Sequence, residues 1–282
     1  MNATTPSANA LDAPDAGLRL VLPGRSCSFG DGAAWVGRGW KLFTAAWLMW
    51  VISTVVLLVV SLASNLLPIV GALIMGVINP VILGGFIAAC RSLETGGDFE
   101  IEHLLAGFSR RFGKLALLGA ILLAGEIVIA IVFAMFVGFS VLMAIMAGDQ
   151  QAIASAIYAS VGTLLVGTLV CTLLLLPLLA AVWFAPALIY MHDMNVGAAM
   201  AASFSASFRN LLSTLLYALI MLPLALIAVI PIGLGLLVWI PLMLASTYAA
   251  YRDIFTEDVA AGEVAPGEVV LVPPATPIGP AA

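Results

Sequence analysis

One acidic side chain, Glu126, lies deep within a long apolar stretch of the sequence. It follows Lys114 by 12 residues, which corresponds to about 18 Å of helix and a position near the centre of a bilayer. A charged carboxylate at that depth costs at least about 2.5 kcal/mol. Glu126 must therefore face protein or water, be paired, or carry its proton.

The polar side chain of Asn79 is the predicted partner of Glu126. Asn79 precedes Arg91 by 12 residues, so counting from the basic residues places both at the same depth. We hypothesise that protonated Glu126 donates a hydrogen bond to Asn79 across a helical bundle. The functional interpretation is a proton relay or a substrate contact, and the structural one is an interhelical bond worth about 0.6–2 kcal/mol. The structural role is favoured, because a relay needs a chain of ionisable groups and no other lies at this depth.

Outside the apolar stretches, candidates for catalysis are sparse. His103 and His192 fall in separate connections, and the neighbours His192 and Asp193 form a candidate acid–base pair by adjacency alone. Solvated loop histidines are the favoured interpretation. The three cysteines are scattered and form no C-x-x-C motif. We therefore predict no catalytic, metal-binding or cofactor-binding residue and no cofactor, which favours a protein that is not an enzyme.

The composition indicates the class of protein that must position these side chains. Of 282 residues, 63% are hydrophobic and only 25 are charged. Soluble domains are about 45–50% apolar and about 25% charged. The sequence therefore predicts an all-α integral membrane protein, and its net charge of −5 does not suggest binding to nucleic acid.

Apolar segments of about 20 residues or more predict six transmembrane helices. They form a transmembrane domain over residues 39–256, between a disordered N-terminal tail (1–38) and an acidic, proline-rich, disordered C-terminal tail (257–282). The more polar stretch 91–114 is expected to hold a short amphipathic helix at the membrane interface. The predicted spans are 40–64, 66–90, 115–147, 152–190, 211–230 and 236–251, with the path of residues 137–171 beyond the bilayer left open.

A repeated motif groups these spans into three hairpins. The pattern Phe-Ser-x-x-Phe-x-x-Leu begins at Phe108 before the third span and again at Phe204 before the fifth. Pro80 precedes Arg91 by 11 residues, as Pro241 precedes Arg252. Each unit would enter from the same side and return to it, so the repeats are predicted to be parallel. Transporters often contain internal repeats, but duplication of hairpins also builds any helical bundle.

Basic residues predict the orientation of the chain. All ten lie before or at the start of the first span, between the second and third, between the fourth and fifth, or after the sixth. The other three connections contain none. The positive-inside rule then places both termini in the cytoplasm of a multi-pass protein of the bacterial inner membrane.

Several short motifs resemble a known family. These are Gly39-Trp40-Lys-Leu-Phe43 before the first span, Asn79-Pro80, Pro231-Ile-Gly-Leu-Gly235, and Tyr251-Arg-Asp-Ile-Phe255 after the sixth. Together they resemble a family of uncharacterised, mostly proteobacterial, multi-spanning inner-membrane proteins that carries a domain-of-unknown-function label. The resemblance covers residues 35–256, and the Tyr-Arg-Asp-Ile-Phe run is its most specific part. It implies a helical membrane protein and supplies no catalytic residue.

Three functions remain open from the sequence. The favoured one is a non-enzymatic scaffold or accessory protein of the inner membrane that binds the lipid bilayer and a partner, either a second copy or another membrane protein. The alternative is a transporter or channel for a small or lipidic solute that uses Glu126 and Asn79 at the bilayer midplane. A membrane enzyme would need a cytoplasmic pocket that collects His103, His192 and Asp193.

Overall fold

The computed structural model describes residues 17–146, 150–258 and 269–271, and it confirms the predicted all-α helical bundle. The helices are α1 (Asp31–Ala45), α2 (Trp47–Ser64), α3 (Pro68–Glu94), α4 (Ile101–Leu104), α5 (Ala106–Ser109), α6 (Phe112–Met146), α7 (Gln150–Val182), α8 (Ala185–His192), α9 (Val196–Arg209), α10 (Leu211–Val229) and α11 (Leu236–Phe255). Three short strands accompany them: β1 (Leu18–Leu22), β2 (Thr256–Asp258) and β3 (Val269–Leu271).

Three consecutive helix pairs follow the order that the sequence predicts. They are α2–α3, α6–α7 and α10–α11, and each follows one or two shorter helices along the chain. The α10–α11 turn contains Ile232 and Gly233, both with positive φ. Glycine adopts that conformation without strain, which suits the tight break predicted at 231–235. The similarity of the three units in sequence stays a prediction.

Five helical segments in the described residues are long and apolar enough to cross a membrane. They are Trp47–Ser64, Ile69–Glu94, Phe112–Gly138, Val161–His192 and Leu211–Val229, with mean hydropathies of 2.1 to 2.7. The sixth predicted span is a helix, α11, but it is not among these five. It ends in the charged pair Arg252 and Asp253, and much of it is buried against its neighbours.

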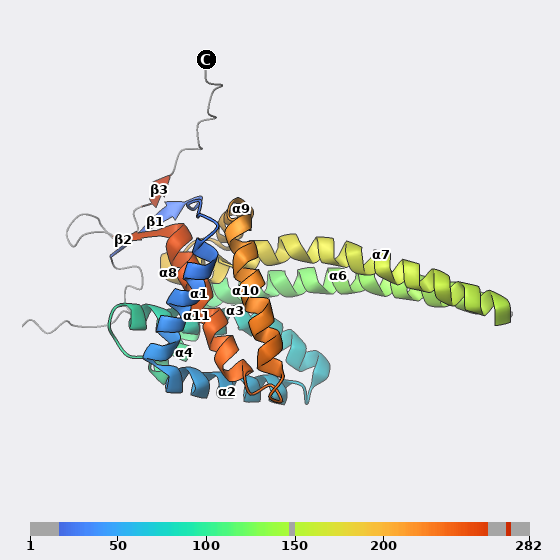
Figure 1. The fold of residues 1–282 in the computed structure, drawn as a ribbon, viewed down its shortest axis with the longest axis horizontal. Helices are drawn as coiled ribbons and strands as arrows, with labels where there is room; N and C mark the ends of the chain where they lie inside the picture. Colours follow the sequence, from blue (N-terminus) through green and yellow to red (C-terminus); the bar gives the residue numbers. More distant parts are fainter. Residues whose placement is uncertain (1–16, 147–149, 259–268, 272–282) are drawn as a thin grey trace, which may run out of the picture.

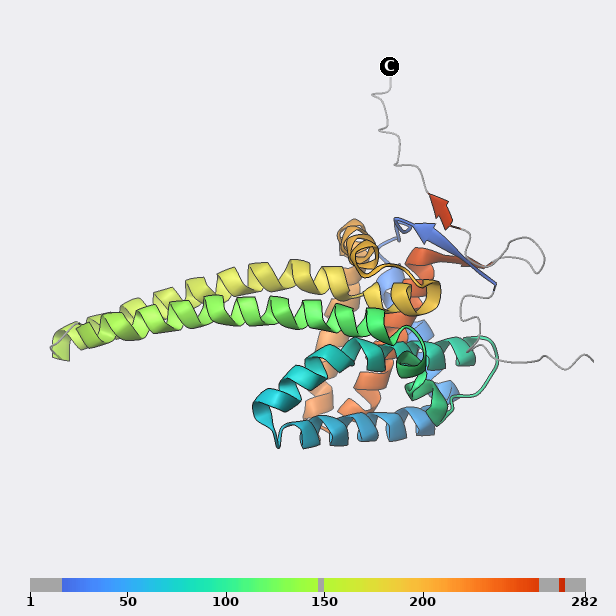
Figure 2. The ribbon, with the colours of Figure 1, turned by 180° about the vertical axis from the view of Figure 1, so that it is seen from behind.

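The α6–α7 hairpin projects far from the rest of the molecule (Figures 1 and 2). Its helices have 35 and 33 residues, or roughly 50 Å each at 1.5 Å per residue. They pack closely along their length: Gly125 lies against Leu178, and Gly167 against Phe136. The segment 137–171, whose path the sequence left open, thus belongs to the two helices on either side of residues 147–149.

The first predicted span is in fact two helices. α1 begins at Asp31, before the predicted start at Trp40, and the chain breaks at Ala46, whose φ of −143° and ψ of 42° are not helical. α1 packs against α11 rather than continuing into α2. Gly39 permits the close approach, because a Cβ there would lie 2.6 Å from the backbone nitrogen of Ser246.

The fourth predicted span, 152–190, also divides. α7 ends at Val182 and α8 begins at Ala185, with Pro186 in its first turn. Proline disfavours helical geometry in the residue before it and supplies no amide hydrogen, so a helix break here has a local cause. α8 is buried from Ala185 through Met191 and lies in the interior of the folded body.

Parts of both predicted tails are folded. Strand β1 pairs antiparallel with β2 and parallel with β3, and Leu20 and Val21 of β1 are buried. The prediction that 1–38 is a disordered tail is therefore wrong for residues 18–38. The same holds for Glu257, Asp258 and β3 in the predicted C-terminal tail. Strand pairing across more than 200 residues leaves no local signal in the sequence.

The connection 91–114 differs in detail from the expected amphipathic helix. Two four-residue helices, α4 and α5, replace it. Its apolar residues still face outward together, because Leu105, Phe108 and Phe112 are exposed. The rings of Phe108 and Phe112 stack with centroids 6.1 Å apart.

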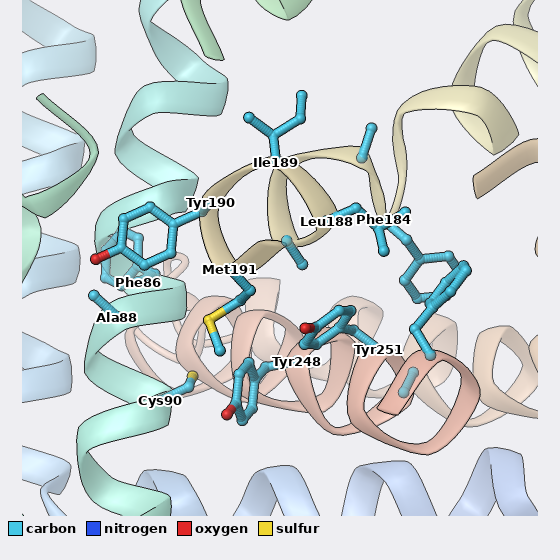
Figure 3. Close-up of a cluster of buried hydrophobic side chains, with 14 of the residues drawn as sticks. Phe86, Ala88, Cys90, Phe184, Leu188, Ile189, Tyr190, Met191, Tyr248 and Tyr251 are labelled. Carbon is cyan, nitrogen blue, oxygen red and sulfur yellow. The ribbon is translucent and has the colours of Figure 1, made fainter. Parts of the chain in front are cut away.

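The core lies where α3, α8 and α11 meet (Figure 3). Tyr190 and Met191 of α8 point toward Phe86 of α3 and Tyr248 of α11. Tyr190, Met191 and Tyr248 are each at most 2% exposed. Burial of side chains of this size contributes roughly 1.5–3 kcal/mol each, so this cluster anchors α8 between the two longer helices.

Candidate functional site

Glu94, at the C-terminal end of α3, is the centre of a polar network. Its carboxylate accepts hydrogen bonds from the Arg252 Nε at 2.8 and 2.9 Å and from the Tyr248 hydroxyl at 2.7 Å. Arg91, one helical turn before it, donates at 3.0 Å. Arg252 also pairs with Asp258 at 2.6 Å. The network therefore ties α3 to the end of α11 and to β2.

Asp253, the next residue, makes a second connection, to α1. Its carboxylate accepts hydrogen bonds from the Trp35 Nε1 at 2.8 Å and from the Arg38 Nη2 at 2.8 Å. Burial alone would raise the pKa of this carboxyl, but the hydrogen bonds from Arg38 and Trp35 outweigh burial and lower it. Asp253 is therefore a carboxylate at neutral pH.

Cys27 and Asp31 lie beside Asp253, so three potential metal ligands come within 4.8 Å of one another. This group was not predicted, because Asp253 lies more than 200 residues along the chain from Cys27 and Asp31. Burial and the charge of Asp253 raise the pKa of the Cys27 thiol to about 12, whereas metals bind the thiolate. Asp31 accepts hydrogen bonds from the Ser28 backbone and hydroxyl. These contacts make the group a hydrogen-bonded cluster.

A charged cavity of about 610 Å³ opens beside these networks. It lies between α1, the end of α3, the end of α11 and β2. Four basic and four acidic residues line it: Arg25, Arg38, Lys41, Arg252, Glu94, Asp253, Glu257 and Asp258. Its formal charge is therefore balanced.

The basic residues that line the cavity differ in whether they form ion pairs. Arg25, Arg38 and Arg252 each pair with a lining carboxylate. Hydrogen bonds from Arg252 to Glu94 raise the pKa of its guanidinium further, although burial opposes this. Lys41 is exposed and has no polar partner among the described residues. It is therefore the lining cation that is free to meet an anionic group from outside.

The predicted acid–base pair of His192 and Asp193 does not form. His192 turns toward α11, where its Nε2 lies 2.6 Å from the Tyr251 hydroxyl. Asp193 adopts a left-handed conformation with φ of 55° and binds Lys114 at 2.8 Å and Arg111 at 3.0 Å. The reversal of the backbone at Asp193 sends the two neighbouring side chains to different partners.

His103 lies in a different connection from His192 and Asp193. It is 6% exposed, and its Nδ1 accepts a hydrogen bond from the Glu100 backbone at 3.0 Å at the start of α4. It is buried rather than solvated, contrary to expectation. The charged cavity is lined by none of His103, His192 and Asp193, so the pocket that the enzyme hypothesis required is not built there.

Glu126 and Asn79 are not level with each other along the packed helices α6 and α3. α3 and α6 run antiparallel, with Gly84 against Leu115 and Gly76 against Leu123. Asn79 is thus level with a point about two turns before Glu126, a separation of roughly 10 Å along the helices. The count from Arg91 and Lys114 is wrong because the two helix ends are not level.

Both side chains are exposed, and the hydrogen bond expected between them is not formed. Glu126 has no polar partner among the described residues. Neither residue lines the charged cavity. Their role as a polar site within the membrane stays a prediction.

The Tyr-Arg-Asp-Ile-Phe run is the signal that could have located the networks. Tyr251 meets His192, Arg252 meets Glu94, and Asp253 meets Arg38. The Ile254 carbonyl accepts a hydrogen bond from the Arg25 backbone at 2.7 Å. Sequence reasoning noted the run as a family motif but gave no role to its charged pair.

Comparison with known proteins adds no assignment: no protein-family model, no curated protein and no solved structure matches this chain. The resemblance to uncharacterised inner-membrane proteins therefore stays a prediction based on the motifs.

Proposed function

We propose that this protein is a non-enzymatic scaffold of the bacterial inner membrane that binds phospholipid. The charged cavity beside α1 holds the phosphate of the lipid headgroup. The observation that carries this proposal is Lys41, an exposed cation on the rim of a cavity whose other basic residues are already paired with carboxylates.

The surroundings of Lys41 suit a headgroup. Trp40 and Trp47 are 49% and 58% exposed, and tryptophan is enriched where a protein meets the headgroup layer. An apolar cavity of about 710 Å³, lined in part by Trp40 and by Trp239 of α11, lies along the neighbouring surface of α1. A phosphate at Lys41 would therefore have apolar protein beside it for its acyl chains.

Three aromatic pairs support the same placement of the membrane surface, and each has at least one exposed ring. Trp40 stacks near Phe43, Phe108 near Phe112 and Phe204 near Phe208, with ring centroids 4.7 to 6.1 Å apart. Each pair lies before or at the start of one of the three helix pairs and close in sequence to basic residues. We infer that they mark the cytoplasmic interface, with both termini on that side.

Native mass spectrometry of the protein released from nanodiscs tests the lipid site. Nanodiscs of phosphatidylethanolamine and phosphatidylglycerol would be used in parallel. We expect retained phospholipid on the native chain and a loss of at least one bound lipid in Lys41→Ala. Both lipids contain the phosphate, so the effect should appear in both nanodiscs.

Lys114→Ala is the matched control. It removes the same charge outside the cavity, where the Lys114 ammonium binds the backbone and carboxylate oxygens of Asp193. Equal lipid retention by Lys41→Ala and the native chain would refute the site. An equal loss in both variants would indicate non-specific attraction to the headgroup layer.

A further inference from the structure

The face of α6 that packs on α3 continues beyond the point where α3 diverges from it, and no helix of the described residues covers it there. Gly119, Leu123, Glu126, Ala130 and Phe133 are alternately four and three residues apart, a spacing typical of one helix-packing face. The first two lie against α3. The last three are exposed, and Figure 2 shows α3 diverging from α6 toward its own N-terminal end, so that this face of the hairpin is left uncovered.

The uncovered part of this face begins with the least suitable residue for contact with lipid. Glu126 is the only acidic or basic residue more than one turn inside the described spans, and it has no described polar partner. Exposure of a carboxyl group to hydrocarbon is costly whether or not it is charged. A second helix on this face would remove that cost if it offered a hydrogen bond at the same depth.

We propose that this face joins two copies of the chain. The α6 helices of the two copies lie side by side around a two-fold axis normal to the membrane. Each Glu126 carboxyl then donates to or accepts from the other. The interface continues through Ala130 and Phe133.

Two features favour a second copy as the occupant. A carboxyl group that carries its proton is both donor and acceptor, so Glu126 is complementary to itself and needs no basic partner. An axis normal to the membrane also keeps equivalent residues at equal depth, so residues near the axis meet their own copies. Glu126 and Asn79, by contrast, differ in depth and cannot meet this way.

The residues beyond Glu126 permit close approach. Ala130 and Ala134 follow it at intervals of four residues, and both are exposed. Small residues at this spacing are common where membrane helices touch. A single polar residue in such a face also fixes the register between two helices.

Cysteine cross-linking in native membranes tests this contact. Ala130→Cys should give a disulfide-linked dimer on mild oxidation, above the level of the native chain with its own three cysteines. Val128→Cys is the matched control, because Val128 is 57% exposed on the opposite face of α6. Equal cross-linking at 128 and 130 would overturn the proposal, as would none at 130.

Mass photometry of the protein in nanodiscs gives the second measurement. We expect Glu126→Leu to weaken the dimer roughly 3- to 30-fold, the range for one interhelical hydrogen bond in a membrane. Glu126→Gln should retain it, because an amide also donates and accepts. A monomeric native chain, or a dimer unchanged in Glu126→Leu, would contradict the contact. Lys41→Ala should leave the dimer intact, so the lipid site and the dimer fail independently.

Discussion

At the scale of single residues, Glu94 has the greatest structural consequence. Three donors from two helices converge on one carboxylate, and its side chain is 30% exposed. We expect Glu94→Ala to lower the free energy of unfolding by roughly 2 kcal/mol, because Arg252 and Tyr248 lose a common acceptor in a partly buried setting. Thermal unfolding in detergent measures the loss.

Glu102→Ala serves as the comparison for that variant. Glu102 is an exposed acid in α4 with no described side-chain partner, so its loss should change the unfolding temperature little. If both variants unfold at the native temperature, the Glu94 network does not stabilise the fold.

Asp253 makes stability depend on pH in a defined direction. Its pKa is lowered in the folded protein, so the folded state binds its proton less readily than the unfolded chain does. The resulting stabilisation is present above the ordinary aspartate range and is lost as the pH falls through the lowered pKa. We expect Asp253→Asn to flatten the decline in unfolding temperature between neutral and acidic pH. A decline as steep as that of the native chain would contradict this.

The residues that do chemistry were only partly predictable. Hydropathy identified Glu126 as an isolated acid, because a single charge in an apolar run is visible locally. It could not pair Glu94 with Arg252 or Cys27 with Asp253, since those contacts join residues more than 150 positions apart. The sequence also could not predict that Glu126 is exposed, because the residues on the buried and the lipid-facing sides of a membrane helix are both apolar.

At the scale of elements, the contact between α1 and α11 depends on a missing side chain. Gly39→Ala should lower the free energy of unfolding by roughly 1–3 kcal/mol, because the new methyl group collides with the backbone at Ser246. Gly37→Ala, two residues earlier on α1, meets nothing within 4 Å. It should be neutral or stabilise by up to about 1 kcal/mol through helix propensity. Paired thermal melts of the two variants decide between these outcomes.

Helix pairs were easier to predict than helix breaks. Long apolar runs separated by polar or glycine-containing turns correctly placed the three pairs of helices. The breaks at Ala46 and before Ala185 lie inside apolar runs, where hydropathy stays high. Packing of α1 on α11 decides the break at Ala46 and leaves no periodic mark in the local sequence. Pro186 is a local cause of the break before Ala185, but a proline alone does not show that a helix ends, since Pro177 lies inside α7.

At the scale of the whole molecule, the distribution of basic residues predicts a topology that labelling can test. We expect Asn65→Cys in the α2–α3 turn and Ile232→Cys in the α10–α11 turn to react with an impermeant maleimide added outside the cell. Ile232 is 99% exposed. Thr95→Cys, on the basic side, should react only after permeabilisation. Protection of Ile232→Cys in intact cells would show that α10 does not cross.

The α6–α7 hairpin is longer than the hydrocarbon layer of a bilayer is thick. Its helices are roughly 50 Å long, whereas the hydrocarbon layer is about 30 Å thick. A hairpin of this length that crosses the bilayer must lean steeply, gather thicker lipid around itself, or extend into water with apolar side chains exposed, and each has a free-energy cost. That cost falls as the membrane thickens. The hairpin would therefore favour thick regions of a membrane and would make the protein's distribution sensitive to acyl-chain length.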